Sequence, residues 1–194
     1  RADCQQHFLK RNPSSSEIMH KIPIVYISND YNADNRTSSH HIAYRLGNDF
    51  KILHIEAGCT RMPRASKGDA LKIFKKLRLF FTGLRKVNQN VVVGSVILPQ
   101  FISNPLLRAM FLYITRLQLL IFQTISKTNK PIYWCTHPTL IKAISPLPRS
   151  LLVYYCVDDF ASMPGVEVTR ISELDDQITR EADIIFTPSR PLYE

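Results

Sequence analysis

Residues 151–156 read LLVYYC and run directly into the acidic pair Asp158 and Asp159. A helical pattern follows at 171–182, and a second apolar stretch at 183–186 then leads into a polar loop. Strand, acid-bearing loop, helix, strand and polar loop is the order typical of a parallel α/β sheet. In such sheets the binding sites lie at the carboxyl ends of the strands. This stretch therefore predicts an α/β fold with a site at that edge.

Further apolar runs precede this stretch. They are short and continuous, as strands buried on both faces of a parallel sheet are. The runs cover residues 22–28, 50–55, 91–98 and 131–135, and helical patterns between them cover residues 40–46, 64–87 and 104–128. We expect Ser38 or Ser39 to cap the first helix and Gly47 to end it. The sequence predicts a doubly wound, mainly parallel Rossmann-like sheet of about six strands with helices on both faces.

Length and composition favour one domain. The chain has 194 residues, 45% of them hydrophobic, which is enough for one sizeable core. We expect residues 21–194 to form this single domain. Residues 1–20 are polar and contain Asn-Pro-Ser-Ser-Ser at positions 12–16, so we expect an unstructured extension. The four cysteines lack metal spacing, and we expect free thiols in a reducing cytoplasm.

The helical pattern at 104–128 is the segment that most resembles a membrane span. It includes Arg108, Arg116, Gln118 and Gln123, which interrupt the apolar run where a span should be dry. We therefore expect an amphipathic helix buried in the domain.

The positive charge is concentrated in one segment. Of the net charge of +9, nearly all falls in residues 61–86, which carry nine Lys or Arg and a single Asp. The helical pattern there places Lys72, Lys75, Lys76 and Arg78 largely away from the apolar positions. We expect these four residues to bind an anionic membrane surface, and the alternative is a solvated basic face. Nucleic acid is not an expected partner, because no recognised motif accompanies the charge.

The loop after the first strand, residues 29–37, reads NDYNADNRT and contains no glycine. Glycines let the backbone approach a pyrophosphate in the Rossmann dinucleotide site, so their absence argues against a standard NAD or FAD site. The G-x-x-x-x-G-K-[ST] phosphate loop is missing as well. Bound phosphate would need Arg36 or the helix N-terminus at 38–40. Arg36 and His40 could equally be ordinary polar loop residues.

Three more residues stand at the carboxyl ends of predicted strands. His137 follows the fourth strand and could position or deprotonate a hydroxyl, or only hold its turn. One of Asp158 and Asp159 could accept hydrogen bonds from sugar hydroxyls or act as a base, while the other caps local backbone. His40, His41 and His137 lack a thiol or carboxylate at zinc spacing, so we expect no metal site.

Four features follow one another along the chain: a strand–polar loop–helix opening, His137, residues 154–160 (YYCVDDF) and residues 181–194 (EADIIFTPSRPLYE). In this order they resemble the N-terminal lobe of GT-B glycosyltransferases. The likeness spans residues 22–194. It is greatest to the retaining bacterial enzymes that build cell-surface polysaccharides, teichuronic acid and phosphoinositol mannosides.

The resemblance implies an acceptor-binding lobe. In this family the N-terminal lobe binds the acceptor and often touches the membrane, whereas the C-terminal lobe binds the nucleotide-sugar. His137 matches a histidine in the cleft near the transferred sugar, and the loop at 29–40 matches one beside the donor diphosphate and the acceptor. We therefore expect His137 as the catalytic residue. The expected substrate-binding residues are Asn29, Asp30, Arg36, His40, Asp158 and Asp159.

The expected reaction transfers a sugar from a nucleotide-sugar to a lipid-linked or polysaccharide acceptor, without a metal or other cofactor. It would take place at the inner face of the cytoplasmic membrane, with the protein cytoplasmic and peripheral. The donor lobe is not part of the 194 residues, so we expect the isolated chain to be inactive. A non-catalytic membrane-associated scaffold, a subunit of a split transferase and a small-nucleotide Rossmann enzyme are the alternatives.

Overall fold

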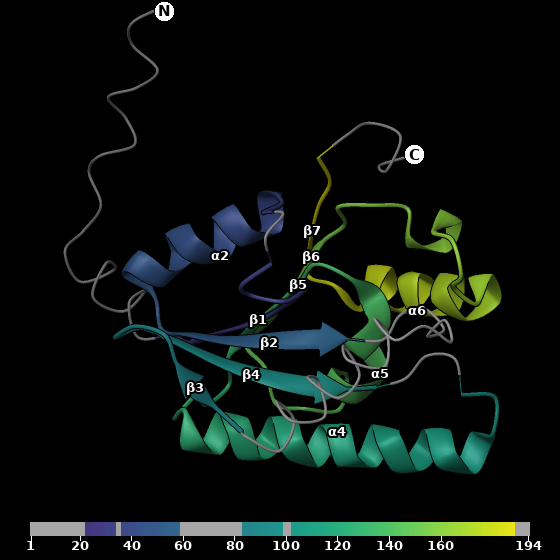
Figure 1. The fold of residues 1–194 in the computed structure, drawn as a ribbon, viewed down its shortest axis with the longest axis horizontal. Helices are drawn as coiled ribbons and strands as arrows, with labels where there is room; N and C mark the ends of the chain where they lie inside the picture. The colour runs from purple at the N-terminus through teal and green to yellow at the C-terminus, as the bar shows by residue number, and fades with distance from the viewer. Residues whose placement is uncertain (1–21, 34–35, 59–82, 99–101, 189–194) are drawn as a thin grey trace, which may run out of the picture.

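The computed structural model describes residues 22–33, 36–58, 83–98 and 102–188. These residues form a seven-stranded sheet in the order β3-β4-β2-β1-β5-β6-β7 (Figure 1). All neighbouring strands pair in parallel except β3 and β4, which are antiparallel. The predicted doubly wound, Rossmann-like α/β fold is confirmed.

The strands are short and mostly coincide with the apolar runs of the sequence. They are β1 (Ile24–Ser28), β2 (Ile52–Gly58), β3 (Arg85–Lys86), β4 (Val91–Ile97), β5 (Ile132–Cys135), β6 (Leu151–Tyr155) and β7 (Ile184–Phe186). The helices are α2 (Ser38–Asp49), α4 (Pro105–Ile125), α5 (Ile141–Ile144) and α6 (Val168–Glu181), and the 3-10 turns are η1 (Pro138–Leu140) and η2 (Phe160–Ser162).

The helices cover both faces of the sheet, because the chain moves away from β1 in both directions. From β1 it passes through α2 to β2, and it later returns through α4 to β5 on the other side of β1. Crossovers between parallel strands are right-handed, so α2 and α4 must lie on opposite faces. Figure 1 shows α2 above the sheet and α4 below it. One apolar cluster accordingly contains Ala43 of α2, and the other contains residues of α4, α5 and α6.

Helix α2 begins and ends elsewhere than predicted. Its N-cap is Thr37, not Ser38 or Ser39, and the helix runs to Asp49. Gly47 therefore lies inside the helix and does not end it. A Cβ atom at Gly47 would lie 2.7 Å from Val91 Cγ2, so the glycine permits close approach of α2 to the sheet.

The predicted basic helix at 64–87 falls mostly outside the described residues, as do Lys72, Lys75, Lys76 and Arg78. The prediction of a helix is wrong for the last residues of this segment, because Arg85 and Lys86 form strand β3, which pairs with the edge of β4. Arg85 pairs with Glu56 of β2, its Nη2 lying 2.9 Å from Oε1. Backbone pairing with β4 thus makes a strand where the charge pattern suggested a helix, and the ion pair fixes the Arg85 side chain across the sheet.

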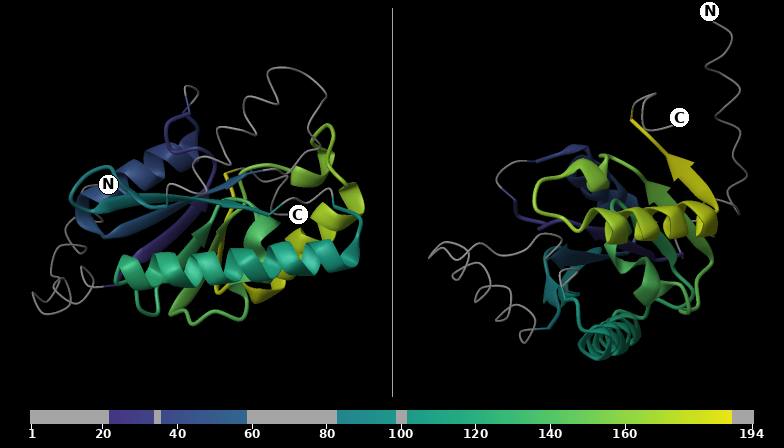
Figure 2. Two further views of the ribbon diagram at one scale, coloured as in Figure 1. Left: turned by 60° about the horizontal axis from the view of Figure 1, so that its bottom comes forward. Right: turned by 90° about the vertical axis from the view of Figure 1, so that its right-hand side faces the viewer.

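Helix α4 is present as predicted, but most of its apolar side chains are not buried, contrary to the prediction. Only a narrow face that includes Leu119 and Phe122 joins the core. Its other apolar residues are largely exposed, with Leu106 at 79% and Tyr113 at 68%. By length and composition α4 is also the one helix of the described residues that could cross a membrane. Figure 2 shows it lying along one side of the molecule.

Candidate functional site

A crevice lies at the carboxyl ends of β1, β5 and β6. This is the point where connections leave neighbouring strands towards opposite faces, which is where ligands bind in open α/β sheets. The cavity measures about 210 Å³. We call it the carboxyl-edge crevice, and it is lined by Asn29, Thr37, Ser38, Ser39, Thr136, His137, Val157, Asp158, Phe160 and Met163.

The seam between β1 and β5 forms the base of the carboxyl-edge crevice. The backbone N–H of Thr136 donates to the carbonyl of Ile27 at 3.0 Å. Its hydroxyl also donates to the Ser28 hydroxyl at 3.1 Å. These bonds fix the ends of both strands together, so the next residues, Asn29 and His137, face one crevice.

His137 is held tightly, with only 3% of its surface exposed. Its Nδ1 lies 2.8 Å from the hydroxyl of Thr139, and its ring meets Phe160 edge to face at 6.3 Å between centroids. It is also the N-cap residue of η1. The structure thus gives the imidazole a fixed orientation at the wall of the carboxyl-edge crevice, and imidazole can both donate and accept protons near neutral pH.

The N-terminus of α2 supplies a positive end to the same crevice. Tyr155 donates to the Ser38 hydroxyl at 3.2 Å, and Tyr26 donates to the Ser39 carbonyl at 2.8 Å, which anchors the first turn to the sheet. No acidic residue lies in that turn. A helix N-terminus attracts anions through its dipole and its backbone N–H groups. An anionic group in the carboxyl-edge crevice would be stabilised there.

The two aspartates after β6 have different environments. Asp158 is exposed and lines the carboxyl-edge crevice. Asp159 instead caps η2, accepting from the backbone N–H groups of Ala161 and Ser162. The hydrogen bond from the Ser162 hydroxyl, helped by these backbone bonds, lowers the pKa of the Asp159 carboxyl. Asp159 is therefore the member of the pair that caps local backbone, whereas Asp158 lines the carboxyl-edge crevice.

The remaining predicted residues do not line the carboxyl-edge crevice. Arg36 and His40 line a separate cavity between α2 and β2. His40 fastens the loop, since its Nδ1 accepts from the Thr37 N–H at 3.1 Å and its Nε2 lies 2.9 Å from the Asp30 carbonyl. Nε2 must then carry the proton and donate to that carbonyl. Asp30 turns the loop by accepting from the Asn32 N–H at 3.0 Å.

Two buried polar residues of β2, His54 and Glu56, were not predicted as site residues. Glu56 accepts from the Tyr31 N–H at 3.1 Å, from Arg85 at 2.9 Å and from the Ser95 hydroxyl at 2.6 Å. It thereby ties the first loop to β3 and β4. The sequence did contain a sign of them, because a histidine and a glutamate interrupt the apolar run ILHIEAG. Side chains alternate between the two faces of a strand, so these two residues lie on the same face.

Within the described ranges, no group of three or more His, Cys, Asp or Glu side chains is arranged to hold a metal ion. The free thiols described, Cys135 and Cys156, are both buried. Burial raises the pKa of the Cys135 thiol, because it disfavours the thiolate. Cys135 is thus an inert core residue.

No protein-family model and no curated protein sequence matches the chain. Among solved structures, a similar chain is described as "Trehalose-6-phosphate from E. coli bound with UDP-2-fluoro glucose". The two are 12% identical with a TM-score of 0.44, and the match covers 84% of this chain and 39% of that chain. The present chain thus spans well under two thirds of its length.

Proposed function

We propose that this chain is the acceptor-binding lobe of a GT-B glycosyltransferase. The complete enzyme transfers a sugar from a nucleotide-sugar, bound by a second lobe, to a lipid-linked or polysaccharide acceptor. The observation that carries the proposal is the carboxyl-edge crevice, where Asn29, His137 and Asp158 meet the N-terminus of α2. Such a site can position an acceptor hydroxyl and stabilise a diphosphate, which are the main requirements of sugar transfer from a diphosphate.

Each group has a separate task in this mechanism. His137, fixed by Thr139 and Phe160, orients the acceptor hydroxyl or receives its proton. Asp158 and Asn29 hydrogen-bond sugar hydroxyls at the open side of the carboxyl-edge crevice. The positive end of α2 faces the phosphates.

Acceptor binding by the isolated chain tests this assignment. The probe is a farnesyl-diphosphate-linked disaccharide, measured by saturation-transfer NMR and calorimetry. His137→Ala and Asp158→Asn should each weaken binding about tenfold, as expected for lost hydrogen bonds to polar or charged groups. The control Asp176→Asn, on the exposed surface of α6, should bind like the parent. Unchanged binding in both crevice variants would overturn the assignment.

Transfer assays test the half-enzyme part of the proposal. With a nucleotide-sugar and the same acceptor, the isolated chain should give no transfer product, because the second lobe binds the nucleotide-sugar. Sugar transfer by the isolated chain would show that the donor site lies within these residues and would contradict the proposal.

Helix α4 supports the further proposal that the lobe works at an anionic membrane surface. At 100° per residue, its exposed apolar residues fall within about 140° of the helix circumference. This α4 stripe consists of Leu106, Leu107, Met110, Tyr113, Ile114, Leu117, Leu120, Ile121 and Ile125. Helix α4 contains no acidic residue, and the net charge of +9 favours anionic lipid over other apolar partners.

The arginines of α4 lie outside the α4 stripe. Arg108 donates to the carbonyl of Ile102 at 3.1 Å, and Arg116 donates to the carbonyl of Lys142 at 2.7 Å. Both side chains are thus bound to the protein and leave the stripe uncharged. An uncharged apolar stripe on a basic protein suits shallow insertion among lipid headgroups.

Vesicle co-sedimentation tests the membrane proposal. The chain should bind phosphatidylcholine vesicles containing phosphatidylglycerol, and less so at high salt. The double variant Leu117→Gln/Ile121→Gln should reduce binding without lowering stability, because both side chains are exposed. Val168→Gln, an equally exposed apolar site on α6, is the matched control. Equal binding of the parent and the double variant would contradict a role for the α4 stripe.

The same stripe favours a second candidate function, a non-catalytic membrane scaffold or a subunit of a split transferase. A separately produced donor lobe distinguishes these candidates. Transfer on mixing would favour the split enzyme, whereas vesicle binding without transfer under any mixture would favour the scaffold.

A further inference from the structure

A second cavity lies between α2 and the strands β2 and β3, apart from the carboxyl-edge crevice. It measures about 530 Å³, within the usual range for small-molecule sites. We call it the α2 pocket, and it is lined by Tyr31, Asn32, Arg36, His40, His41, Ala43, Tyr44, His54 and Val87. None of these residues lines the carboxyl-edge crevice.

The floor of the α2 pocket is an unusual histidine. His54 is 1% exposed, and neither ring nitrogen has a hydrogen-bond partner among the described residues. Its ring meets Tyr26 and Tyr31 edge to face, with centroids 5.6 and 5.1 Å away. Leaving a buried donor and acceptor unpaired costs free energy, because each group loses its hydrogen bonds to water. A ligand that supplied both bonds would recover this free energy.

His54 is neutral at physiological pH. Burial lowers the pKa of His54 to about 3, because it disfavours the charged imidazolium; the neighbouring His40 and Arg85 add to this, and Asp30 opposes it only in part. A neutral imidazole presents one N–H donor and one acceptor nitrogen. A hydroxyl group both donates and accepts, so a hydroxyl-bearing ligand matches this floor.

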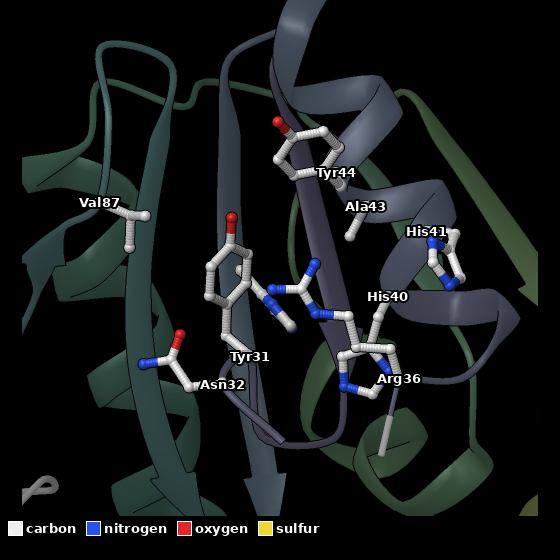
Figure 3. A pocket seen from close by; sticks show the side chains of 9 residues that line it. Tyr31, Asn32, Arg36, His40, His41, Ala43, Tyr44 and Val87 are labelled. Atoms are coloured by element: carbon white, nitrogen blue, oxygen red, sulfur yellow. The ribbon is translucent and has the colours of Figure 1, made fainter. Parts of the chain in front are cut away.

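The rim of the α2 pocket combines aromatic and cationic groups. Tyr31 and Tyr44 offer rings on which the apolar face of a ligand ring can pack. Figure 3 shows Arg36 reaching into the space beside Tyr31, with Tyr44 and His41 on the α2 side and Val87 opposite. Among the lining residues that the structure describes, none is Asp or Glu. The guanidinium of Arg36 can therefore bind a phosphate or carboxylate through a bidentate pair of hydrogen bonds.

Several walls of the α2 pocket are fixed in place. The Tyr31 backbone is held by Glu56, and His40 is bonded on both sides of its ring. Ala43, at 3% exposure, is the smallest side chain among the lining residues named above. A preformed pocket loses less conformational entropy on binding.

We propose that the α2 pocket binds an anionic sugar unit, a hydroxyl-bearing ring that carries one phosphate or carboxylate. Its hydroxyls pair with His54, its ring packs on the tyrosines, and its anionic group binds Arg36. The inference goes beyond the proposed function, because it concerns a different cavity and holds for a transferase or a scaffold alike.

Calorimetry and 1H–15N NMR with the parent chain test the proposal. The probes are glucose 1-phosphate, glucuronate, glucose and inorganic phosphate. The first two should bind at least tenfold more tightly than the last two, because only they engage Arg36 and His54 together. Comparing glucose 1-phosphate with glucuronate tells which anionic group is preferred. The proposal would be overturned if inorganic phosphate bound as tightly as glucose 1-phosphate or glucuronate, or if no probe bound.

Matched variants assign the contacts. Arg36→Gln should weaken binding of the tighter probe about tenfold, whereas Arg45→Gln, an exposed arginine of α2 outside the α2 pocket, should not. The carboxyl-edge variant His137→Ala should also leave this affinity unchanged, which separates the proposal from the proposed function. Equal losses in Arg36→Gln and Arg45→Gln would mean a diffuse charge effect and would contradict the α2 pocket.

His54→Leu provides the sharpest test. Replacing an unpaired polar group by an apolar one of similar size should leave the melting temperature equal or higher, while the sugar-acid affinity falls. Should this variant fail to fold, the imidazole 15N signals of His54 in the parent report the same contact, and they should shift on addition of glucuronate. A folded His54→Leu variant with full affinity, or unmoved His54 signals, would overturn the role of His54.

Discussion

At the residue scale, His54 and Glu56 lie two positions apart on one face of β2 but have opposite surroundings. Glu56 receives three hydrogen bonds from three different elements, whereas both nitrogens of His54 lack partners among the described residues. The first arrangement stabilises the fold. The second destabilises it, which is typical of groups retained for binding.

The end of α4 offers a residue-scale prediction. Lys127 has φ 54°, and two backbone bonds close the helix there: Lys127 N–H to Thr124 O at 3.2 Å and Thr128 N–H to Gln123 O at 2.9 Å. This is the Schellman arrangement, which favours glycine at the left-handed position. Lys127→Gly should therefore stabilise the fold by about 0.5–1 kcal/mol in urea unfolding. A loss of stability in this variant would contradict the geometry, and Lys142→Gly, in α5, should destabilise as the control.

Glu181, the last residue of α6, gives a pH-dependent prediction. Partial burial raises the pKa of its carboxyl, but hydrogen bonds from Gln177 and Ser145 and the charge of Arg149 outweigh this, and the pKa is lowered overall. The unfolded state then binds more protons, so this stabilisation is full above the unfolded pKa of about 4.3 and is lost as the pH falls.

Glu181→Gln should accordingly flatten the fall in stability below about pH 5 relative to the parent, as measured by melting temperature against pH. The matched control is Glu173→Gln, an exposed position on the same helix. If the melting temperatures of Glu181→Gln and the parent fall equally steeply below about pH 5, the assignment is contradicted.

The positions of the candidate site residues were only partly predictable from the sequence. His137 and Asp158 follow strands directly, and strand order alone brings their loops together. The α2 pocket could not be predicted, since Arg36 and His54 belong to different elements and meet only through the packing of α2. Within the apolar run of β2, a histidine gives no sign of whether it will find a partner.

At the element scale, Gly47 shows how packing outweighs local propensity. Alanine inside a helix is favoured over glycine by about 1 kcal/mol. Its Cβ would lie 2.7 Å from Val91 Cγ2, however, and Val91 is buried at 2% exposure.

Gly47→Ala should therefore destabilise the fold by about 1–3 kcal/mol despite its better propensity, in chemical unfolding. In the double variant with Val91→Ala, part of the loss should be recovered, because the smaller side chain removes the contact. Stabilisation by Gly47→Ala alone would show that α2 can move away freely.

The elements themselves were predicted better than their environments. Short apolar runs indicated all the central strands, because parallel strands are buried on both faces. Helix α4 was predicted at the right place but as buried, since an apolar composition usually means a core. Strand β3 was misassigned because Arg85 and Lys86 carry no strand signal, and their pairing depends on β4 and Glu56.

At the scale of the whole molecule, the alternation of strands and helices was enough to predict the doubly wound sheet. Right-handed crossovers then determine which face each connecting helix covers, once the strand order is known. The roles of the α4 stripe and of the α2 pocket depend on which faces remain uncovered. Such faces are properties of the assembled sheet and leave no local pattern in the sequence.

The central position of β1 also has a consequence for folding. Strands β2 and β4 can join β1 early, but β5, β6 and β7 attach to them only through β1, where Thr136 and Ile27 meet across 109 positions of the chain. Closing so long a loop carries a large entropy cost, so we expect this pairing to form late. In pulsed hydrogen exchange, the Thr136 amide should gain protection after those of β2. Simultaneous protection would contradict this order. The carboxyl-edge crevice lies on that same seam, and it is therefore completed only when the two halves of the sheet join.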